Sequence, residues 1–468
     1  MTAGPELVPS VEPPGGAPTH SLPSEVAVGV GPAAPWYRLL NRQQWNALIA
    51  SNLGWLFDGY ETYALILTVA VALRELLAPG EAPRLPFYAG VVIAITLFGW
   101  GIGGILGGIA ADYLGRKRTM IISIVAYSLL TGLSALSWSW ESFALLRFLV
   151  GICIGTEWGT GTSMMAEMWP SHARGKGAGL MQCGLGIGFF LASSVWFVVS
   201  SAGPGAWRIM YLLGVLPALL TLWIRRRIQE PELWTAVDRR RQAVRQARRL
   251  RQPIKAEEAD YAQFTLAALF TDPTLRRLTV VGFLMSLTTM VGWWGISSWV
   301  PPYVATLGPR TLLSPEQWSS VAGMVYNVGA VGGYVGLGFT ADRFGRKPVT
   351  AAYFAMSLIL TPVLFLWVRD IALVLVVTAI NGFFTLGQYS WMPTWLPEIY
   401  PTRVRATGIS FVFNVVRFVA FLGPLLAGTL ISMLGGYSIA ATSFAVIYVL
   451  GLVAVIFFPE TRGKPLPA

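Results

Sequence analysis

The stretch Gly108-Ile-Ala-Ala-Asp112-Tyr-Leu-Gly115-Arg116-Lys117 returns 230 residues later as Gly338-Phe-Thr-Ala-Asp342-Arg-Phe-Gly345-Arg346-Lys347. A second motif repeats at almost the same spacing: Glu167-Met-Trp-Pro170 with Arg174, and Glu398-Ile-Tyr-Pro401 with Arg405. A third match links Glu230-Pro231 to Pro459-Glu460. Three matches at one spacing indicate an internal duplication, so the chain consists of two equivalent halves.

Long apolar runs surround these motifs. Of the 468 residues, 54% are hydrophobic and only 12% are charged, about half the charge density of a soluble protein. The runs lie at roughly 46–73, 88–110, 119–137, 142–165, 177–201, 207–224, 277–305, 319–340, 350–367, 371–394, 406–433 and 437–458. Each is long enough to cross ~30 Å of hydrocarbon as a helix. The sequence predicts an all-α membrane protein with twelve transmembrane helices in two six-helix repeats, an arrangement typical of transporters.

The loops predict the domains and the orientation. Residues 1–35 hold eight prolines, five glycines and no Lys or Arg, so they read as a disordered tail without a signal peptide. Basic residues gather in alternate loops, which predicts a protein of the cell inner membrane with both termini on the cytoplasmic side. The expected divisions are a tail at 1–40, a bundle at 41–225, a cytoplasmic linker at 226–275, a bundle at 276–460 and a tail at 461–468.

Several classes of function are excluded. The net charge of +11 lies in loops between apolar runs, so it favours orientation in a membrane over nucleic-acid binding. Cys153 and Cys183 fall inside apolar runs, and His20 and His172 fall in a tail and a loop. We therefore expect no metal site, no cofactor and no enzyme activity. The arginine-rich linker favours contact with anionic lipid, and a specific partner site is the alternative.

The duplicated loops resemble the signature of the major facilitator superfamily. Arg147-Phe-Leu-Val-Gly151 and the Glu-x-x-Pro-x-x-x-Arg loops resemble its sugar-porter-like branch. Asp58-Gly-Tyr-Glu61 is similar to the acidic pair of aromatic-acid/proton symporters, and 155–161 is similar to sialate/lactate symporters. The stretch Gly292-Trp-Trp-Gly295 lacks the Gln-Gln of sugar porters, which favours an organic acid as substrate.

Charges inside the spans are expensive and therefore call for a function. Such charges do not recur in the other half, because the positions equivalent to Arg147, Glu157 and Arg417 are Thr378, Gln388 and Gly186. The candidates are Asp58, Glu61, Arg147, Glu157 and Arg417.

Glu61 and Arg147 are expected to meet. Counted along their helices, Glu61 lies roughly 24 Å from the cytoplasmic end and Arg147 roughly 8 Å from the outer end, which is a similar depth in a ~30 Å core. The resemblance implies that such a pair couples transport to protons, with Glu61 or Asp58 carrying the proton. The alternative is a permanently paired salt bridge.

Arg417 lies roughly 16 Å into its helix, close to the midplane. A carboxylate substrate would satisfy its guanidinium in a bidentate manner. The alternative is an ion pair with Asp58 or Glu157. Glu157 itself is predicted either as a second proton site or as part of a network with Arg174. Further residues predicted to contact substrate are Asn414, Gln388, Trp294, Tyr389 and Asn381.

The charged loop residues form a separate class. The resemblance implies an inter-helix charge lattice that holds the outward-open state and breaks on switching, and the alternative is that basic loops only set topology. The predicted gating residues are Asp112, Arg116, Glu167, Arg174, Asp342, Arg346, Glu398 and Arg405.

Together these observations predict a monomeric, proton-coupled symporter of a small organic acid anion, lactate-like or aromatic, working by alternating access. The alternatives are a sugar or polyol symporter, a drug or cation exporter, and a transporter-like receptor. Arg417 counts against the exporter, because a cation site needs acids without an anchoring Arg.

Overall fold

The computed structural model describes residues 35–203, 205–254, 256–313, 315–423, 431 and 433–467. Residues 1–34, most of the tail predicted at 1–40, lie outside this part. The short 3-10 helix η1 (Trp36–Arg38) belongs to a unit of its own, Met1–Leu39, while Leu40–Ala468 forms a second unit. All regular secondary structure in the described residues is helical, as the sequence predicts.

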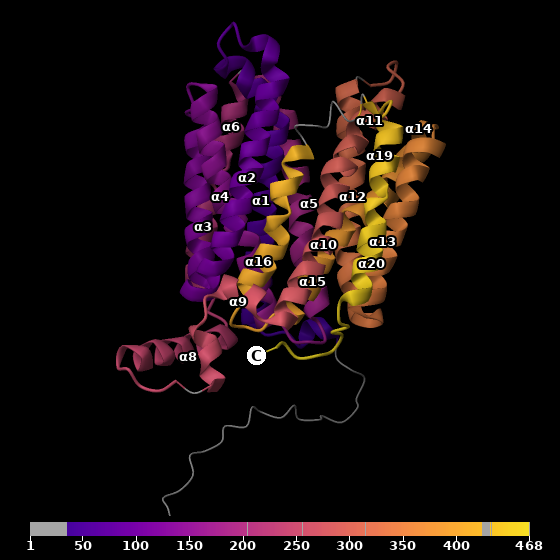
Figure 1. The fold of residues 1–468 in the computed structure, drawn as a ribbon. Helices are drawn as coiled ribbons and strands as arrows, with labels where there is room; N and C mark the ends of the chain where they lie inside the picture. Colours follow the sequence, from indigo (N-terminus) through magenta and orange to yellow (C-terminus); the bar gives the residue numbers. More distant parts are fainter. Residues whose placement is uncertain are drawn as a thin grey trace, which may run out of the picture. The chain divides into compact units, whose positions relative to one another are not determined.

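The first half of the second unit contains the helices of the predicted spans one to six (Figure 1). They are α1 (Arg42–Leu76), η2 (Ala82–Arg84), α2 (Leu85–Leu114), α3 (Arg116–Ser134), α4 (Trp140–Met168), α5 (Arg174–Val199), η3 (Ser200–Ala202), α6 (Ala206–Leu213) and α7 (Pro217–Arg227). The linker that follows contains α8 (Glu232–Arg249), η4 (Ala256–Ala262) and α9 (Thr265–Thr271).

The second half repeats this plan with more interruptions. Its helices are α10 (Pro273–Gly295), η5 (Ser297–Trp299), α11 (Val300–Leu307), α12 (Pro315–Phe344), α13 (Arg346–Pro362), the π-helix η6 (Val363–Trp367), α14 (Ile371–Thr385), η7 (Gly387–Ser390), α15 (Trp391–Trp395), η8 (Leu396–Glu398), α16 (Arg405–Val415), α17 (Arg417–Ala420), α19 (Tyr437–Ala445) and α20 (Ile447–Phe457). The predicted span 406–433 includes residues 424–430 and 432, which lie outside the described part.

Two predicted spans are broken for visible reasons. The span 207–224 divides into α6 and α7, and Pro217 stands in the first turn of α7. The span 277–305 divides into α10 and α11, and Pro301 and Pro302 stand in the first turn of α11. Proline has no N–H to donate, so it suits the first turn of a new helix and not the middle of a continuous one.

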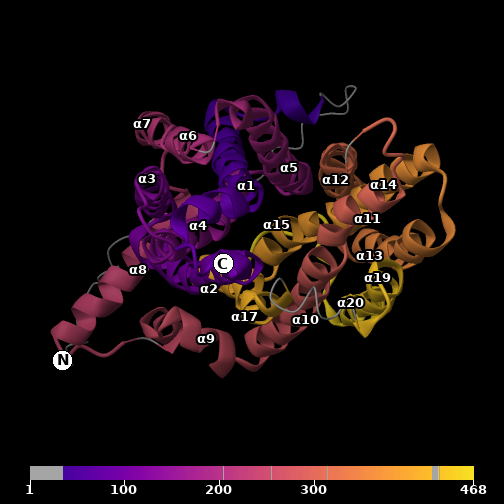
Figure 2. The same cartoon turned by 90° about the horizontal axis from the view of Figure 1, so that it is seen from above.

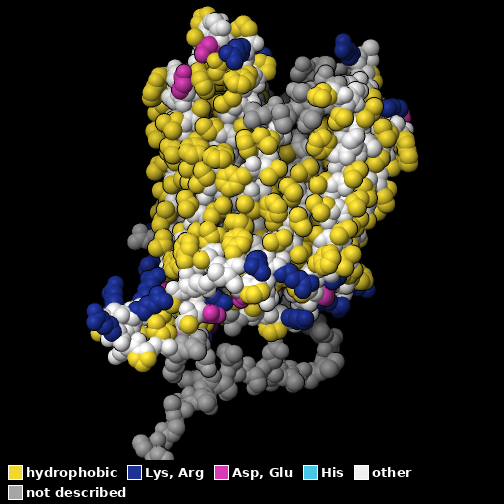
Figure 3. Space-filling view, in the orientation of Figure 1, with side chains coloured by type: hydrophobic (Ala, Val, Ile, Leu, Met, Phe, Trp, Pro, Cys, Tyr) yellow, Lys and Arg dark blue, Asp and Glu magenta, His cyan; other side chains and the backbone are white. Residues whose placement is uncertain are grey.

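The described chain has ten helical stretches long and apolar enough to cross a membrane. They cover every predicted span except 119–137 and 406–433. The first of these corresponds to α3, which begins with three consecutive basic residues, and the second is only partly described. In Figure 3 hydrophobic side chains form a broad band over the helices, and most Lys and Arg gather at one end. We call this end, which carries Arg116, Arg174, Arg346 and Arg405, the basic end.

Glycines set the close packing of the helices. On α2, a Cβ at Gly103 would lie 1.8 Å from the carbonyl oxygen of Ile152 on α4, and Gly155 on α4 meets Trp100 in the same way at 2.3 Å. Two further seams join the halves, which lie side by side in Figure 2. Gly108 packs α2 against Ala406 of α16, and Gly338 packs α12 against Gly175 of α5. Small residues let helix backbones approach closely in membranes.

Candidate functional site

The first element of the site is an ion pair between α1 and α4. Arg147 donates from Nη1 to Glu61 and from Nη2 to the hydroxyl of Ser134 at 2.7 Å. The guanidinium also lies over the ring of Tyr211, 4.6 Å from its centroid. Both charged residues are buried, at 2% and 1% exposure. The contact expected from their depth in the sequence is present.

The second element is Arg417, which is 4% exposed and begins α17. Its carbon Cζ lies 4.3 Å from the ring centroids of both Trp100 and Phe413. Its Nη1 donates to the carbonyl of Phe413 at 2.8 Å and to Oδ1 of Asn414 at 2.9 Å. Among the described residues, no hydrogen-bond acceptor meets Nε and no carboxylate lies within ion-pair distance. The alternative pairing of Arg417 with Asp58 or Glu157 is therefore not formed in this structure.

Two adjoining pockets connect these elements. One is lined by Glu61, Arg147 and apolar residues of α1, α2 and α4. The other is lined by Arg417 and a ring of large side chains: Trp55, Trp100, Phe189, Met290, Trp293, Trp294, Tyr389 and Phe413. Thr62, Leu97, Trp100 and Trp294 line both. Arg417 and the Glu61–Arg147 pair therefore line two neighbouring pockets, and the pocket of Arg417 is mainly aromatic.

The predicted substrate residues divide into three groups. Trp294 and Tyr389 line the Arg417 pocket. Asn414 lies behind Arg417 and holds its Nη1 by accepting a hydrogen bond. Gln388 and Asn381 are fully buried and line neither of the two pockets; the former donates to the carbonyl of Thr385, and the latter accepts from its hydroxyl.

Asp58 and Glu157 stand apart from both arginines. They are 0% and 2% exposed, and none of their four carboxyl oxygens has a hydrogen-bond partner among the described residues. Arg174, the predicted alternative partner of Glu157, instead pairs with Glu398. The network alternative for Glu157 is therefore not formed in this structure.

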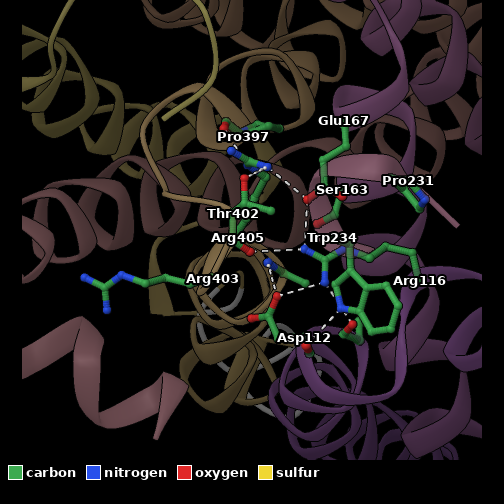
Figure 4. A network of polar contacts seen from close by, with 12 residues as sticks. Asp112, Arg116, Ser163, Glu167, Pro231, Trp234, Pro397, Thr402, Arg403 and Arg405 are labelled. Atoms are coloured by element: carbon green, nitrogen blue, oxygen red, sulfur yellow. Dashed lines mark hydrogen bonds and ion pairs between the residues drawn. The ribbon is translucent and has the colours of Figure 1, made fainter. Parts of the chain in front are cut away.

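A buried charge network closes the basic end (Figure 4). Arg116 reaches Asp112 at 3.1 Å and Glu167 at 2.8 Å, and Arg405 from the other half reaches the same oxygen of Glu167 at 2.9 Å. Asp112 accepts from the backbone N–H and the hydroxyl of Thr407 at 2.9 and 2.6 Å. It thus satisfies free N–H groups in the first turn of α16, where a negative charge is favoured.

An equivalent network is centred on the second half, and here the first half contributes the additional arginine. Arg346 reaches Asp342 at 3.1 Å and Glu398 at 2.7 Å, and Arg174 from the first half reaches Glu398 at 3.3 Å. Asp342 accepts from the backbone N–H groups of Gly175 and Lys176, in the first turn of α5. All eight predicted gating residues therefore belong to two symmetric networks, each of which joins the two halves.

The linker helix α8 adds contacts that the sequence did not predict. Trp234 donates to the carbonyl of Asp112 at 3.0 Å, and Arg241 donates to the carbonyls of Asp112 and Arg403. Asp260 of η4 pairs with Arg403 at 3.0 Å. Burial lowers the pKa of the Arg241 guanidinium, although Asp112 acts in the opposite direction. The linker therefore holds the end of α2 to the loop before α16.

The third repeated motif supplies helix caps. Glu230 accepts from the backbone N–H groups of Lys117 and Arg118, and Glu460 accepts from those of Arg346 and Lys347 at 3.0 Å each. Between each Asp and Arg, Gly115 and Gly345 adopt φ of 102° and 105°, a region that glycine enters without strain. Burial acts to raise the pKa of Glu460, but hydrogen bonds from four backbone N–H groups lower it overall.

Sequence reasoning missed the aromatic residues that build the pocket. Trp55, Trp100 and Phe413 all lie inside predicted spans, and none of them is among the residues predicted to contact substrate. Their signal was spacing: Trp55 precedes Asp58 by three residues and Phe413 precedes Arg417 by four, so each shares a helix face with a charge. Trp100 has no such neighbour and could be placed only by the packing of α2 against α16.

Comparison with known proteins agrees with this architecture. A family model described as sugar (and other) transporter matches residues 47–468. The cis,cis-muconate transport protein of Acinetobacter baylyi is 28% identical over 383 residues, which are 81% of this chain and 86% of that protein. The sialic acid transporter NanX of Escherichia coli is 26% identical over 415 residues, which are 88% and 93% of the two chains.

The fold is also shared with a solved structure. The proton:xylose symporter XylE of E. coli, bound to 6-bromo-6-deoxy-D-glucose, superposes with a TM-score of 0.71 at 21% identity, over 91% of this chain and 98% of that one. The match of the family model over nearly the whole chain, together with the duplicated basic-end networks, settles the family. This chain belongs to the sugar (and other) transporter family of the major facilitator superfamily, and it is a membrane transporter and not an enzyme.

Proposed function

We propose that this transporter imports a small organic acid anion together with protons by alternating access. The two halves, 41–225 and 276–460, move against each other around the pocket. The protein lies in the cell inner membrane, with both termini on the cytoplasmic side. The functional unit is a monomer, and no cofactor or nucleic acid takes part.

One observation carries this proposal: Arg417 is a buried guanidinium with an unused edge in a pocket between the halves. The rings of Trp100 and Phe413 cover it, and Nη1 is held by Phe413 and Asn414. Its Nε is buried and has no partner among the described residues, so this nitrogen still needs a hydrogen-bond acceptor. A carboxylate fits such an edge in a bidentate manner.

The aromatic lining refines the substrate class. Trp55, Phe189, Trp293, Trp294 and Tyr389 surround the space beside Arg417. Flat side chains favour offset stacking with planar ligands, so an aromatic or conjugated acid is favoured over a lactate-like one. Relatives named for muconate and sialic acid transport support an acid as the substrate class.

Proton coupling is assigned to the Glu61–Arg147 pair. When Glu61 takes up a proton, its attraction to Arg147 is lost, and the α1–α4 contact weakens. Because the pocket of this pair shares Thr62, Leu97, Trp100 and Trp294 with the Arg417 pocket, binding of the substrate and protonation of Glu61 affect each other. This links the proton gradient to the change between the two access states.

The test is uptake into proteoliposomes of 4-hydroxybenzoate, lactate and pyruvate, each with and without an inward proton gradient. We expect gradient-stimulated uptake of at least one acid, fastest for the aromatic one. Arg417→Ala should reduce kcat/KM for that acid about 100-fold, since hydrogen bonds to charged groups contribute roughly 1.5–3 kcal/mol each.

Arg417→Lys is the matched control, because it keeps the charge but loses the planar fork, and we expect an intermediate loss. Glucose and xylose form the second arm, since the chain shares its fold with a xylose symporter. Sugar uptake that survives Arg417→Ala, with no acid transported, would replace the acid by a sugar as substrate.

A further inference from the structure

The structure contains a second buried acidic pair that the proposed cycle does not yet use. The carboxyl groups of Asp58 on α1 and Glu157 on α4 are 0% and 2% exposed. Their four oxygens are buried and accept no hydrogen bond from any described residue. This contrasts with Glu61, one turn along α1, whose Oε1 is paired with Arg147.

Gly54 shows how close the two carboxyl groups are. A Cβ at Gly54 would lie 1.5 Å from Oε1 of Glu157, so the carboxyl of Glu157 occupies the notch left by the missing side chain. Gly54 and Asp58 are four residues apart on one helix, and such positions lie above one another at about 5–6 Å. Glu157 therefore sits within about one helical turn of Asp58.

Among the described residues, no Lys or Arg donates a hydrogen bond to either carboxyl group of this pair. The charged groups that act on Asp58 are Glu157, Glu61 and, with the smallest effect, Arg417. Tyr127 on α3 is within electrostatic range of both carboxyl groups, and its buried hydroxyl also lacks a partner among the described residues. No group of three His, Cys, Asp or Glu side chains suitable for a metal ion occurs among the described residues.

Two unpaired carboxylates cannot both stay ionised in such a place. Burial of an isolated carboxylate is so costly that the group binds a proton instead, and two neighbouring carboxylates oppose each other's ionisation. At least one of the two carboxyl groups is therefore expected to bind a proton.

The opposite half keeps this pair dry. Phe413 of α16 stacks on Trp158, with ring centroids 3.7 Å apart, and also contacts Trp55. A Cβ at Gly159 would lie 1.8 Å from the hydroxyl of Ser410, so α16 packs directly onto α4 two residues from Glu157. Opening of the basic end removes α16 from this surface and lets water reach the carboxyl groups.

We propose that Asp58 and Glu157 form a second proton site, separate from the Glu61–Arg147 pair, which holds a proton while α16 covers it and releases the proton when α16 moves away. This inference rests on the proposed function and sets its stoichiometry at two protons for each carboxylate. With a singly charged acid, one net positive charge enters in each cycle, so transport is electrogenic.

The first experiment detects the proton directly. Infrared spectra of the purified protein at pH 7 should contain the C=O stretching band of a protonated carboxyl group, reduced or shifted in Glu157→Gln and in Asp58→Asn. Glu61→Gln is the matched control and should leave this band in place, because Glu61 is paired with Arg147 and is not one of the two unpaired carboxyl groups. The proposal is overturned if the wild-type spectrum contains no protonated-carboxyl band that Glu157→Gln and Asp58→Asn change. This result counts whether or not the two variants transport the acid.

The second experiment measures charge movement in proteoliposomes. An inside-negative potential at equal pH on both sides should stimulate uptake of the acid by wild-type protein, and Glu157→Gln should lose this stimulation while still exchanging labelled for unlabelled acid. Uptake that responds to the proton gradient but not to the potential overturns the second site and leaves the proposed function intact. If no acid is taken up under any gradient, the proposed function itself fails, and the infrared result decides the second site alone.

Discussion

At the scale of single residues, the charged side chains inside the membrane differ in the partners that surround them. Arg147 has a carboxylate, a hydroxyl and an aromatic face; Arg417 has two aromatic faces and one satisfied nitrogen. The carboxyl groups of Asp58 and Glu157 have no hydrogen-bond partner in the described part of the chain. A charge left without a full set of partners costs free energy, so the incomplete sites mark where substrate and protons are expected to bind.

The Glu61–Arg147 pair leads to a prediction on coupling. Glu61→Gln cannot release a proton, so we expect it to lose accumulation of the acid against a gradient but to retain exchange of labelled for unlabelled acid. Proteoliposome uptake and counterflow measure the two activities. Accumulation at the wild-type level would contradict the assigned role.

A control is needed because Glu61→Gln leaves Arg147 buried without its counter-ion, which costs about 3–5 kcal/mol. The double variant Glu61→Gln/Arg147→Gln removes both charges, and we expect it to recover thermal stability but not coupling. Recovery of stability alone separates the two effects.

At the scale of helices, close packing depends on glycines, which have no side chain. Gly103 lets α2 approach the carbonyl oxygen of Ile152, a backbone atom that cannot rotate away. Trp100, which lines the Arg417 pocket, also lies on α2. The contact between α2 and α4 therefore also fixes the position of this wall of the pocket.

Gly103→Ala should therefore destabilise the protein although alanine is a better helix former. We expect a loss of about 1–3 kcal/mol from overpacking, seen as a lower midpoint of thermal unfolding in detergent. Gly80→Ala is the matched control, because a Cβ at Gly80 meets nothing within 4 Å. Equal midpoints for the two variants would contradict the close approach of α2 and α4.

The cap of α13 predicts a pH dependence. The pKa of Glu460 is lowered by backbone N–H groups from its ordinary value of 4.5, so the ionised cap stabilises the folded state above about pH 4.5. This contribution is lost as the pH falls through the lower folded-state pKa. We expect the wild type to exceed Glu460→Gln in thermal stability at pH 7, with the difference shrinking at acidic pH. A stability difference that grows as the pH falls would contradict a lowered pKa of Glu460 in the folded state.

At the scale of the whole transporter, the two networks at the basic end are related by the duplication and exchange partners between halves. Glu167 binds arginines of both halves, and so does Glu398. The two ion pairs that cross between the halves, Glu167–Arg405 and Glu398–Arg174, must break for the basic end to open. The networks thus favour the state in which this end is closed.

Glu398→Gln should shift the protein toward the state open at the basic end. Removal of one partner of a buried pair costs about 3 kcal/mol or more, which is a shift of about 100-fold in a two-state population. Spin labels on cysteines at the exposed positions Arg118 and Arg343, in a Cys153→Ser/Cys183→Ser background, report the separation of the halves. We expect longer distances in Glu398→Gln and in the equivalent variant Glu167→Gln. An unchanged distance distribution in both would reduce the networks to a topological role.

Much of the architecture could be predicted because its signals are local or repeated. A run of apolar residues long enough for a bilayer gives a helix, and a motif present twice gives the two halves. The pairing of Glu61 with Arg147 followed from helix rise and membrane thickness, which convert sequence position into depth. Gln388 and Asn381 show the limit: the sequence places them inside predicted spans, but it does not give the direction of each side chain around its helix.

Spacing along one chain in a layer of fixed thickness is enough to predict the helical class, the duplication, the depths of Glu61, Arg147 and Arg417 and the residues of the basic-end networks. Which charges meet depends on the packing of the helices in three dimensions. The structure places Arg417 against the rings of Trp100 and Phe413, pairs Glu398 with Arg174, and gives Asp58 and Glu157 no hydrogen-bond partner among the described residues. These outcomes depend on the rotation of each helix and on the seams between the halves, and contacts more than a hundred residues apart leave no periodic signal in a single sequence.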